Sequence, residues 1–343
     1  MSRCFLSLLF QIEYNSLMQT WKKIKENPKL LEKYLIREKV IDAIRDFFKK
    51  QDFHEVSTPI LVPIPSIEPN LEVFKTELRT SKGEVRPGYL IMSPEFSIKK
   101  LLAAGIGNCF EITKCFRNDE EVSSLHNPEF TMLEWYKVGA NYFDVMEDFE
   151  DLFIQIIKKV NPKTNIKKWE YQGKIYNLTT PWPRIRIADA FKKYANLDVL
   201  EVKDEDFYKI YFNKVEPEIL KLGRPYFLYD YPISQASLSK PSKDPNFAER
   251  FEVFLDKLEL GNCFSELTDS DLQLKRFEED KATRMSQGKE DYPIDMDLID
   301  ALKSGMPDVS GIAVGVDRLV MLAGNVETIS ETLFFPDKEI FNL

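Results

Sequence analysis

The segment FRNDEEVSSLHNPEFTMLEWY, residues 116–136, combines residue types that could form a binding site. Its end, EFTMLEWYKV, alternates as a β-strand does, and every second residue of a strand lies on one face. Phe130, Met132, Glu134 and Tyr136 therefore share a face, where a carboxylate among apolar neighbours needs a partner. Two interpretations remain open here. Glu134 is either a core residue paired with a nearby cation, or part of a pocket for a ligand ammonium group with Tyr136 as a second contact.

Two cationic side chains flank the polar loop of the same segment. Arg117 follows the preceding strand, and its guanidinium could be an ordinary edge charge or a clamp for phosphate. His126 lies within the loop and could also reach a phosphate, although a single loop histidine usually has no such role. These residues indicate, but do not by themselves identify, an anion-binding site.

A second candidate site lies in the segment FEVFLDKLELGNCFSE. A two-residue turn at 256–257 would pair Phe254 with Glu259 and Glu252 with Gly261. The two glutamates would then share a face diagonally, roughly 7–8 Å apart at the backbone. Such hard oxygen ligands suit Mg²⁺ held together with substrate phosphates. The alternative is a solvated hairpin with unrelated acids.

The third candidate site is the segment GIAVGVDRLVML near the C-terminus. Gly311 and Gly315 flank a short apolar strand, where a ligand could approach the backbone closely. Arg318 would lie in the first turn of the following helix, where the helix dipole disfavours a cation. Nucleotide phosphate or Asp317 could compensate. The glycine spacing fits neither a P-loop nor a Rossmann fingerprint.

Composition limits the chemistry that these residues can perform. The chain has 343 residues, 43% hydrophobic and 30% charged, and a net charge of −9, so no overall basic footprint for nucleic acid is present. Two histidines and four dispersed cysteines make a Ser-His-Asp or Cys-His enzyme and a histidine-rich zinc site improbable. We expect reduced cysteines, a cytoplasmic location and no membrane span. Catalysis must therefore rest on arginine, lysine and carboxylates.

The elements expected to position these residues form an α+β fold with several antiparallel strands rather than a doubly wound parallel sheet. The main prediction is an antiparallel pair, NCFEITKCF with EFTMLEWYKV, joined by a polar loop. A hairpin is expected at 248–267, and a strand followed by a helix at 308–325. Further strands are expected in FHEVSTPIL, GYLIM and RPYFLYDYPIS, and helices at 28–51, 94–104, 141–160, 187–194, 204–222, 270–285 and 295–303.

Two arginines, a carboxylate pair, an aromatic residue and an acidic pocket together suit adenylation, in which an amino acid carboxylate attacks the α-phosphate of ATP. That reaction needs no side-chain nucleophile, because positioning and charge neutralisation are sufficient.

The same segments resemble the class II aminoacyl-tRNA synthetases. FRNDEEVSSLHNPEF is similar to their second signature motif, GVDRLVML to their third, and the helix ending in VSTPIL to their first. NPEFTMLEWY, ELGNCFSEL and MSPE resemble the lysyl subgroup, and the resemblance covers about residues 30–336. It implies the class II catalytic fold, an antiparallel sheet flanked by helices. The catalytic domain would cover residues 28–343, with a helical insertion near 187–222 and an N-terminal extension at 1–27.

Only some 30 residues precede the first-motif helix, so we expect no anticodon-reading barrel. With SQASL, AERFEVF and GMPDVSGIAVGVDRL, the chain is most similar to the family of ligases that attach (R)-β-lysine to a lysine of elongation factor P. The resemblance implies an ATP- and Mg²⁺-dependent homodimer without stable tRNA binding. The alternatives are a free-standing lysine-activating enzyme with another acceptor, an ammonia-using asparagine synthetase, or a non-catalytic paralogue.

The resemblance also assigns roles to residues at matching positions. Arg117 and Arg318 are the expected catalytic residues, Phe130 stacks on adenine, and either Asp119 or Glu120 contacts adenine. The expected ATP-binding residues are Arg117, Asn118, Asp119, His126, Asn127, Phe130, Glu259, Leu260, Gly315 and Arg318. The expected substrate-binding residues are Ser93, Pro94, Glu95, Glu134, Tyr136, Asn262, Glu266 and Ala313. Glu252 and Glu259 are the expected Mg²⁺ ligands.

Overall fold

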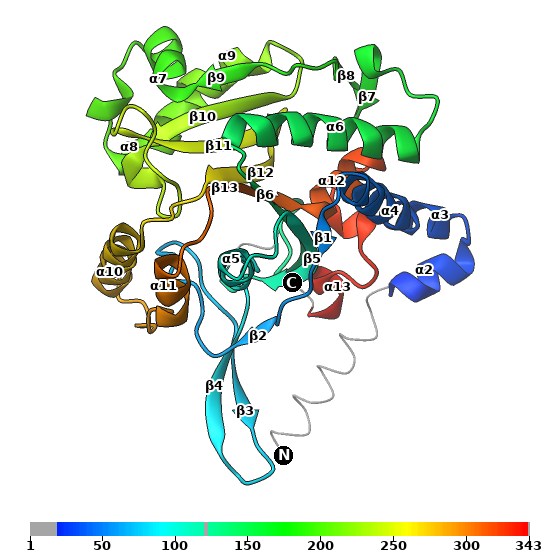
Figure 1. Cartoon of the computed structure of the whole chain (residues 1–343). Coiled ribbons are helices and arrows are strands. Elements are labelled where there is room, and N and C mark those ends of the chain that lie inside the picture. Colours follow the sequence, from blue (N-terminus) through cyan, green and yellow to red (C-terminus); the bar gives the residue numbers. More distant parts are fainter. Residues whose placement is uncertain (1–18, 120–122, 342–343) are drawn as a thin grey trace, which may run out of the picture.

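Alternating apolar residues along six long strands build an eight-stranded sheet at the centre of the protein (Figure 1). The computed structural model describes residues 19–119 and 123–341. Only the outermost pairs, β1 with β5 and β9 with β10, are parallel. The α+β fold with an antiparallel sheet is therefore confirmed. In sheet order the strands are β1 (His54–Glu55), β5 (Cys109–Phe116), β6 (Glu129–Val138), β13 (Val309–Gly315), β12 (Leu258–Ser265), β11 (Phe247–Leu255), β10 (Tyr226–Pro232) and β9 (Arg184–Arg186).

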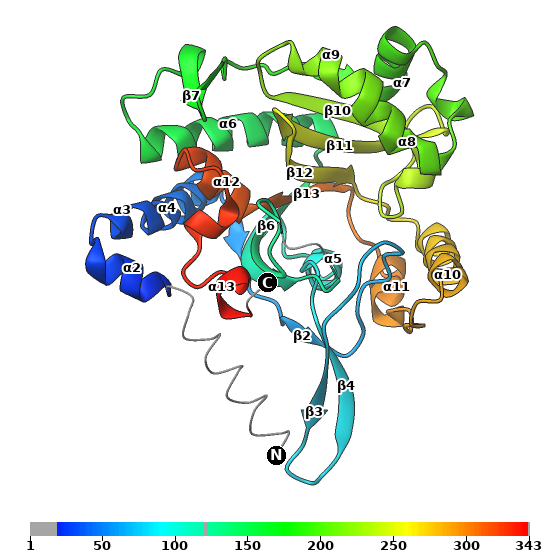
Figure 2. The ribbon, with the colours of Figure 1, turned by 180° about the vertical axis from the view of Figure 1, so that it is seen from behind.

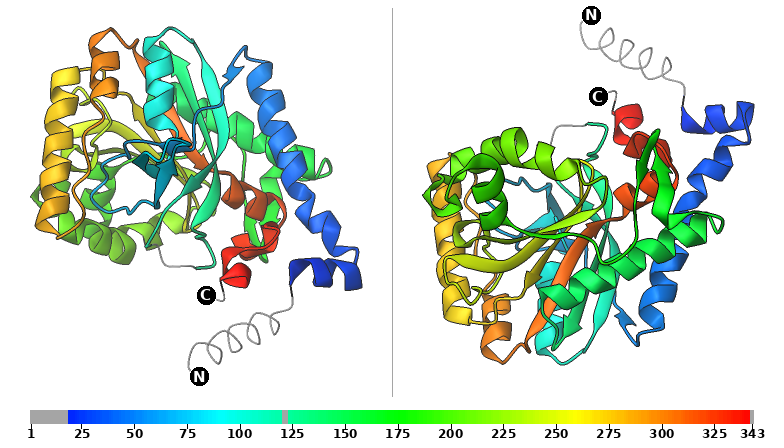
Figure 3. Two further views of the ribbon diagram at one scale, coloured as in Figure 1. Left: turned by 90° about the horizontal axis from the view of Figure 1, so that it is seen from below. Right: turned by 90° about the horizontal axis from the view of Figure 1, so that it is seen from above.

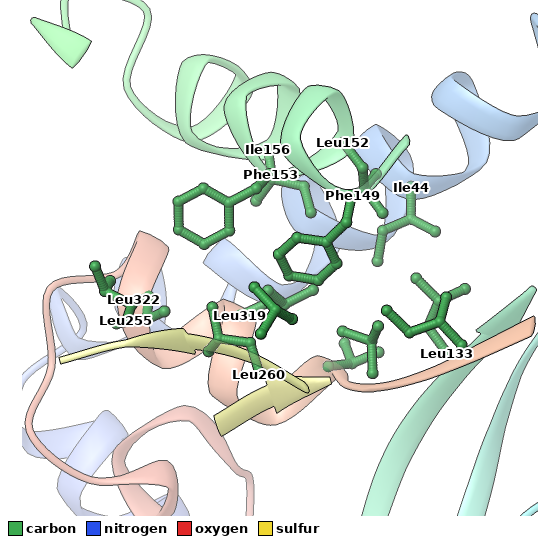
Figure 4. Packing of buried hydrophobic residues seen from close by; sticks show 14 of the residues in the cluster. Ile44, Leu133, Phe149, Leu152, Phe153, Ile156, Leu255, Leu260, Leu319 and Leu322 are labelled. Atoms are coloured by element: carbon green, nitrogen blue, oxygen red, sulfur yellow. The ribbon is translucent and has the colours of Figure 1, made fainter. Parts of the chain in front are cut away.

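Three helices cover one face of this sheet: α4 (Ile36–Lys49), α6 (Tyr142–Val160) and α12 (Val316–Ala323). Helix α6 begins at a capping box formed by Asn141 and Asp144, which satisfies free backbone N–H groups of the first turn. Figure 4 shows its apolar side chains packing onto Leu133 and Leu260 of the sheet. Burying one such side chain contributes about 1.5–3 kcal/mol, so this layer fixes the sheet from behind.

The opposite face carries the polar residues of the strands and is only partly covered. Helices α5 (Glu95–Ala103), α10 (Ser270–Ser286) and α11 (Met296–Lys303) pack together there (Figure 3). Ile98, Phe277 and Ile299 form their shared apolar contact, to which the sheet contributes Tyr136. Strand β6 thus turns Leu133 and Trp135 toward the α6 core and its alternate residues toward this face.

The expected helical insertion covers one end of the sheet beyond β10 (Figure 2). It comprises α7 (Ile187–Ala190), α8 (Asp204–Ile210) and α9 (Glu216–Leu220), and wider π-helical turns interrupt it at Phe191–Ala195 and Tyr211–Val215. A separate apolar cluster, which includes Phe191, Phe207 and Val215, holds these helices onto β10 and β11.

A long hairpin projects from the body of the protein (Figures 1 and 2). Its strands β3 (Lys75–Arg79) and β4 (Val85–Leu90) pair with each other, and β2 (Leu61–Val62) pairs with β4. No helix within the described residues is long and apolar enough to cross a membrane. The remaining elements are α2 (Thr20–Glu26), α3 (Leu30–Tyr34), β7 (Trp169–Tyr171), β8 (Lys174–Tyr176) and α13 (Asp337–Ile340).

Most expected elements are present, but the first expected strand and the first expected helix differ in detail. The expected strand FHEVSTPIL is reduced to the short β1 and β2, because Pro59 between them has no N–H for a ladder hydrogen bond. The expected helix 28–51 is divided at Leu35 into α3 and α4. Most of the expected N-terminal extension, residues 1–18, lies outside the described residues.

The predicted register of the β11–β12 hairpin is partly wrong. Phe254 lies opposite Glu259 as predicted, but Glu252 lies opposite Asn262, and Gly261 lies opposite Val253. A bulge between these pairs adds one residue to β12. The bulge follows Glu259 in the chain, so Glu252 and Glu259 still face the same side.

Candidate active site

A cavity of about 430 Å³ opens on the sheet face away from α6. Four neighbouring strands contribute to it, β6, β13, β12 and β11, because cross-strand partners direct their side chains to one side. The loop before β6 and the start of α12 complete the lining. Most residues predicted for nucleotide, substrate and metal line it: Arg117, His126, Asn127, Phe130, Glu252, Glu259, Leu260, Asn262, Ala313, Gly315 and Arg318.

The cations of the cavity are held in defined positions. Arg318 donates from Nη1 to the backbone oxygen of Glu259 at 2.6 Å, and its Nη2 lies 3.0 Å from His126 Nε2. The Arg117 guanidinium lies over the Phe130 ring, 5.2 Å from its centroid. With Arg250, which pairs with Glu252, three guanidinium groups line the cavity and suit it to phosphate and carboxylate groups.

The side chain of Asp317 contacts residues of α4 and β6. Its carboxylate accepts hydrogen bonds from Arg37 of α4 and from the backbone N–H of Thr131, the latter at 2.7 Å. Asp317 therefore ties α12 to α4 and β6 and is already engaged. Of the two compensating anions expected for Arg318, Asp317 thus has partners in α4 and β6, and the nucleotide phosphate stays a prediction.

Glu252 and Glu259 both line the cavity, as the hairpin prediction required. Glu252 accepts hydrogen bonds from Tyr231 Oη at 2.6 Å and Arg250 Nη2 at 2.5 Å. Burial, followed by the charge of Glu252, raises the pKa of Glu259 to about 7. A buried carboxyl group whose ionisation a neighbouring carboxylate disfavours fits a cation beside it. Within residues 19–119 and 123–341, no group of three or more His, Cys, Asp or Glu could hold a metal ion, so a cation here would need ligand or water oxygens as well.

A cluster of acidic residues adjoins the cavity. Ala313, in the cavity wall, lies directly opposite Glu134 on the neighbouring strand. Glu134 is 1% exposed and Glu266 is 2% exposed, and Tyr136 donates to Glu134 Oε2 at 2.9 Å. Burial raises the pKa of Glu134 and that of Glu266 to about 8 each. The negative charge of Glu95 contributes to both increases. The cluster is therefore short of positive charge and suits an ammonium group.

The segment Ser93–Glu95 brings a third carboxylate to this cluster. Pro94 is the N-cap residue of α5, and Ser93 Oγ accepts from the backbone N–H of Glu95 at 3.0 Å. Ser93 also hydrogen-bonds to Glu134, which lowers the pKa of that carboxyl group against the effect of burial. All the residues predicted for the ammonium pocket are thus close together.

Two predicted nucleotide residues do not reach the cavity. Asn118 forms an isolated bridge with Glu72, and its Oδ1 accepts from the backbone N–H of Asp119 at 3.0 Å. Neither residue lines the cavity. Asp119 has a φ of 57°, at which the chain turns away from the strand. Glu120, the alternative adenine contact, lies outside the described residues.

The sequence prediction missed two residues of the acidic cluster. Lys99 lies between Glu95 and Glu266, and its four-residue spacing from Glu95 is the signal that could have indicated the contact. A Cβ atom on Gly311 would lie 2.3 Å from Tyr136 Cε1 and 2.8 Å from Glu266 Oε1. Gly311 was noted as a strand glycine, but its contact depends on the pairing of β13 with β6, which the sequence does not reveal.

Comparison with known proteins agrees with this geometry. Residues 13–339 match the family described as tRNA synthetases class II (D, K and N). The chain is 40% identical over 317 residues to an "Elongation factor P--(R)-beta-lysine ligase" of Yersinia enterocolitica, covering 88% of this chain and 94% of the relative. Proteins of the same name from Yersinia pestis and Yersinia pseudotuberculosis are 40% identical over 313 residues, with the same coverage. The chain therefore belongs to the tRNA synthetases class II (D, K and N) and groups within them with the elongation factor P--(R)-beta-lysine ligases.

Proposed function

We propose that this protein is an ATP-dependent ligase that adenylates (R)-β-lysine and transfers it to a lysine side chain of elongation factor P. The observation that carries the proposal is the acidic cluster of Glu95, Glu134 and Glu266 beside a cavity lined by three arginines. A substrate that spans both would place its ammonium groups among carboxylates and its carboxylate near Arg117. The names of the relatives supply the particular amino acid and acceptor.

In the first step, a carboxylate oxygen of the amino acid attacks the α-phosphorus of ATP. The bond from that phosphorus to the bridging oxygen breaks, pyrophosphate leaves, and an aminoacyl adenylate forms. Arg117 and Arg318 stabilise the negative charge of the reacting phosphate, and Phe130 offers its ring to adenine. The protein contributes position and charge rather than a nucleophile.

In the second step, the amine of an acceptor lysine attacks the acyl carbon of the adenylate. An amide bond forms, the amine loses a proton, and AMP leaves with the electrons of the broken acyl–oxygen bond. Glu252 and Glu259 would hold a divalent cation, which offsets phosphate charge when it is bound. Burial and mutual repulsion of these carboxylates support that role.

We further infer a homodimer that acts in the cytoplasm, where its acceptor, a translation factor, is found, and that does not bind tRNA stably. The roles of Asn118 and Asp119 at adenine belong to this proposal as well.

ATP–pyrophosphate exchange measures the first step alone and tests the substrate. We expect strong exchange with (R)-β-lysine, weaker exchange with α-lysine, and none with aspartate. Exchange that depends on aspartate would overturn the ammonium pocket, because the three clustered carboxylates would repel that side chain. Absence of exchange with every amino acid would favour the non-catalytic alternative.

A further inference from the structure

Lys99 is buried in the middle of the acidic cluster. Its side chain projects from α5, and the residue is 1% exposed, which is rare for lysine unless it is paired. The ammonium nitrogen lies 2.6 Å from Glu95 Oε1 and 2.7 Å from Glu266 Oε2. Lys99 therefore links the first turn of α5 to the end of β12. The proposed reaction assigns no chemistry to it.

The charge state of Lys99 makes it a counter-ion rather than a nucleophile. Burial alone would lower the pKa of Lys99, but the charges of Glu266 and Glu95 outweigh that effect and raise it. The amine is therefore protonated at neutral pH and cannot compete with an acceptor amine for an activated carbonyl. Its single positive charge offsets one of the three carboxylates, Glu95, Glu134 and Glu266. The two remaining negative charges equal the number of ammonium groups on a diamino acid.

Two carboxylate oxygens of this cluster differ in what they contact. Glu266 Oε2 is buried and accepts from the Lys99 ammonium group, whose nitrogen lies 2.7 Å away. Glu134 Oε1 is buried and accepts no hydrogen bond from any described residue. An acceptor oxygen left buried without a donor is costly, so Glu134 Oε1 indicates where a ligand ammonium group binds.

We propose that Lys99 is a positioning residue for substrate recognition, whose ammonium group bridges Glu95 and Glu266, orients both carboxylates toward the ligand and offsets the negative charge of Glu266. The inference rests on the proposed function, because the ligand is taken to be a diamino acid. It goes beyond that function by assigning recognition to a residue that does not itself need to touch the substrate.

The test uses Lys99→Met, which keeps the length of the side chain and removes its charge. The readout is the pH dependence of kcat/KM for (R)-β-lysine in ATP–pyrophosphate exchange. An opposite charge within about 4–6 Å lowers a carboxyl pKa by roughly 1–3 units. Its removal should therefore move the acid limb of the profile upward by about one pH unit or more, while KM for ATP stays within about threefold. The other ionisable groups around the cluster, which the substitution leaves in place, include Glu111 opposite Glu134 on β5, and Tyr136, Glu68, Cys115 and Cys263.

Two further variants separate charge from packing. Lys100→Met removes the neighbouring lysine, which pairs with Asp295 and Asp297 outside the cluster, and should leave the acid limb unchanged. Lys99→Met combined with Glu95→Gln removes one charge of each sign and should return the limb toward the wild-type position. If Lys99→Met does not fold, this double variant is compared with the wild type instead, because it leaves one carboxylate of the two ion pairs, Glu266, without its partner rather than two.

The outcomes distinguish the inference from the proposed function. A limb that rises in Lys99→Met and returns in the double variant supports the positioning role. A folded Lys99→Met with an unmoved limb overturns it, as does a double variant whose limb stays raised. A wild-type protein without exchange on (R)-β-lysine would instead overturn the proposed function, whatever the variants do.

Discussion

Gly311 gives the sharpest test of the acidic cluster, because a single methyl group should displace two of its residues. In Gly311→Ala the new Cβ would lie 2.3 Å and 2.5 Å from two atoms of the Tyr136 ring and 2.8 Å from Glu266 Oε1. Carbon atoms in contact normally lie about 3.5–4.0 Å apart. The ring must therefore move by about 1 Å, which would break the 2.9 Å hydrogen bond from Tyr136 to Glu134.

We expect Gly311→Ala to lower both the stability and the activity of the protein. Overpacking of this kind typically costs about 1–3 kcal/mol of folding free energy. A displacement of about 1 Å in a substrate-positioning residue can cost about 100-fold in rate, or roughly 2.7 kcal/mol. We expect kcat/KM for (R)-β-lysine in ATP–pyrophosphate exchange to fall about 100-fold, with KM for ATP changed by less than about threefold.

Gly88→Ala is the matched control. Its Cβ would also meet a close neighbour, Leu61 Cδ1 at 2.9 Å, but that atom is the end of an exposed side chain in the projecting hairpin. This variant should fold and catalyse like the wild type. A folded Gly311→Ala protein with normal exchange would refute the placement of Tyr136 and Glu266 in the substrate pocket.

Three further predictions concern the metal, the substrate and pH. Glu259→Gln should reduce exchange to background while the melting temperature changes by only a few degrees, and near-normal exchange would reject the cation site. Ala313→Gly should narrow the preference for (R)-β-lysine over α-lysine, because one carbon in a pocket is worth roughly 1–3 kcal/mol. An unchanged ratio of the two kcat/KM values would show that Ala313 does not set this preference. Since the carboxyl pKa values of Glu134 and Glu266 are raised to about 8, their charged forms increase as pH rises from 6.5 to 8.5. KM for the diamino acid should fall over that range, and a flat or rising KM would contradict the assignment.

The residue pattern within single segments was sufficient to predict most of the fold and much of the site. The alternation in β6 correctly placed Glu134 and Tyr136 on one face, and the turn at 256–257 correctly brought Glu252 and Glu259 to one side. Both inferences depend on periodicity within a strand or across a tight turn, which the sequence carries directly.

The features that sequence reasoning missed depend on contacts between distant segments. The bulge after Glu259 changed the partner of Glu252, and no residue type marks such an insertion reliably. The engagement of Asp317 by Arg37 joins positions 280 residues apart. The position of Lys99 against Glu266 likewise requires α5 to pack beside β12, so the counter-ion within the pocket became visible only in three dimensions.

The mass of the acceptor tests the central claim most directly. Purified elongation factor P would be incubated with this protein, ATP, Mg²⁺ and (R)-β-lysine, and its intact mass would be measured, with tRNA-Lys charging followed under the same conditions. The account predicts a gain of one lysyl residue mass on a lysine of elongation factor P and negligible charging of the tRNA. An unmodified acceptor beside efficiently charged tRNA would contradict it.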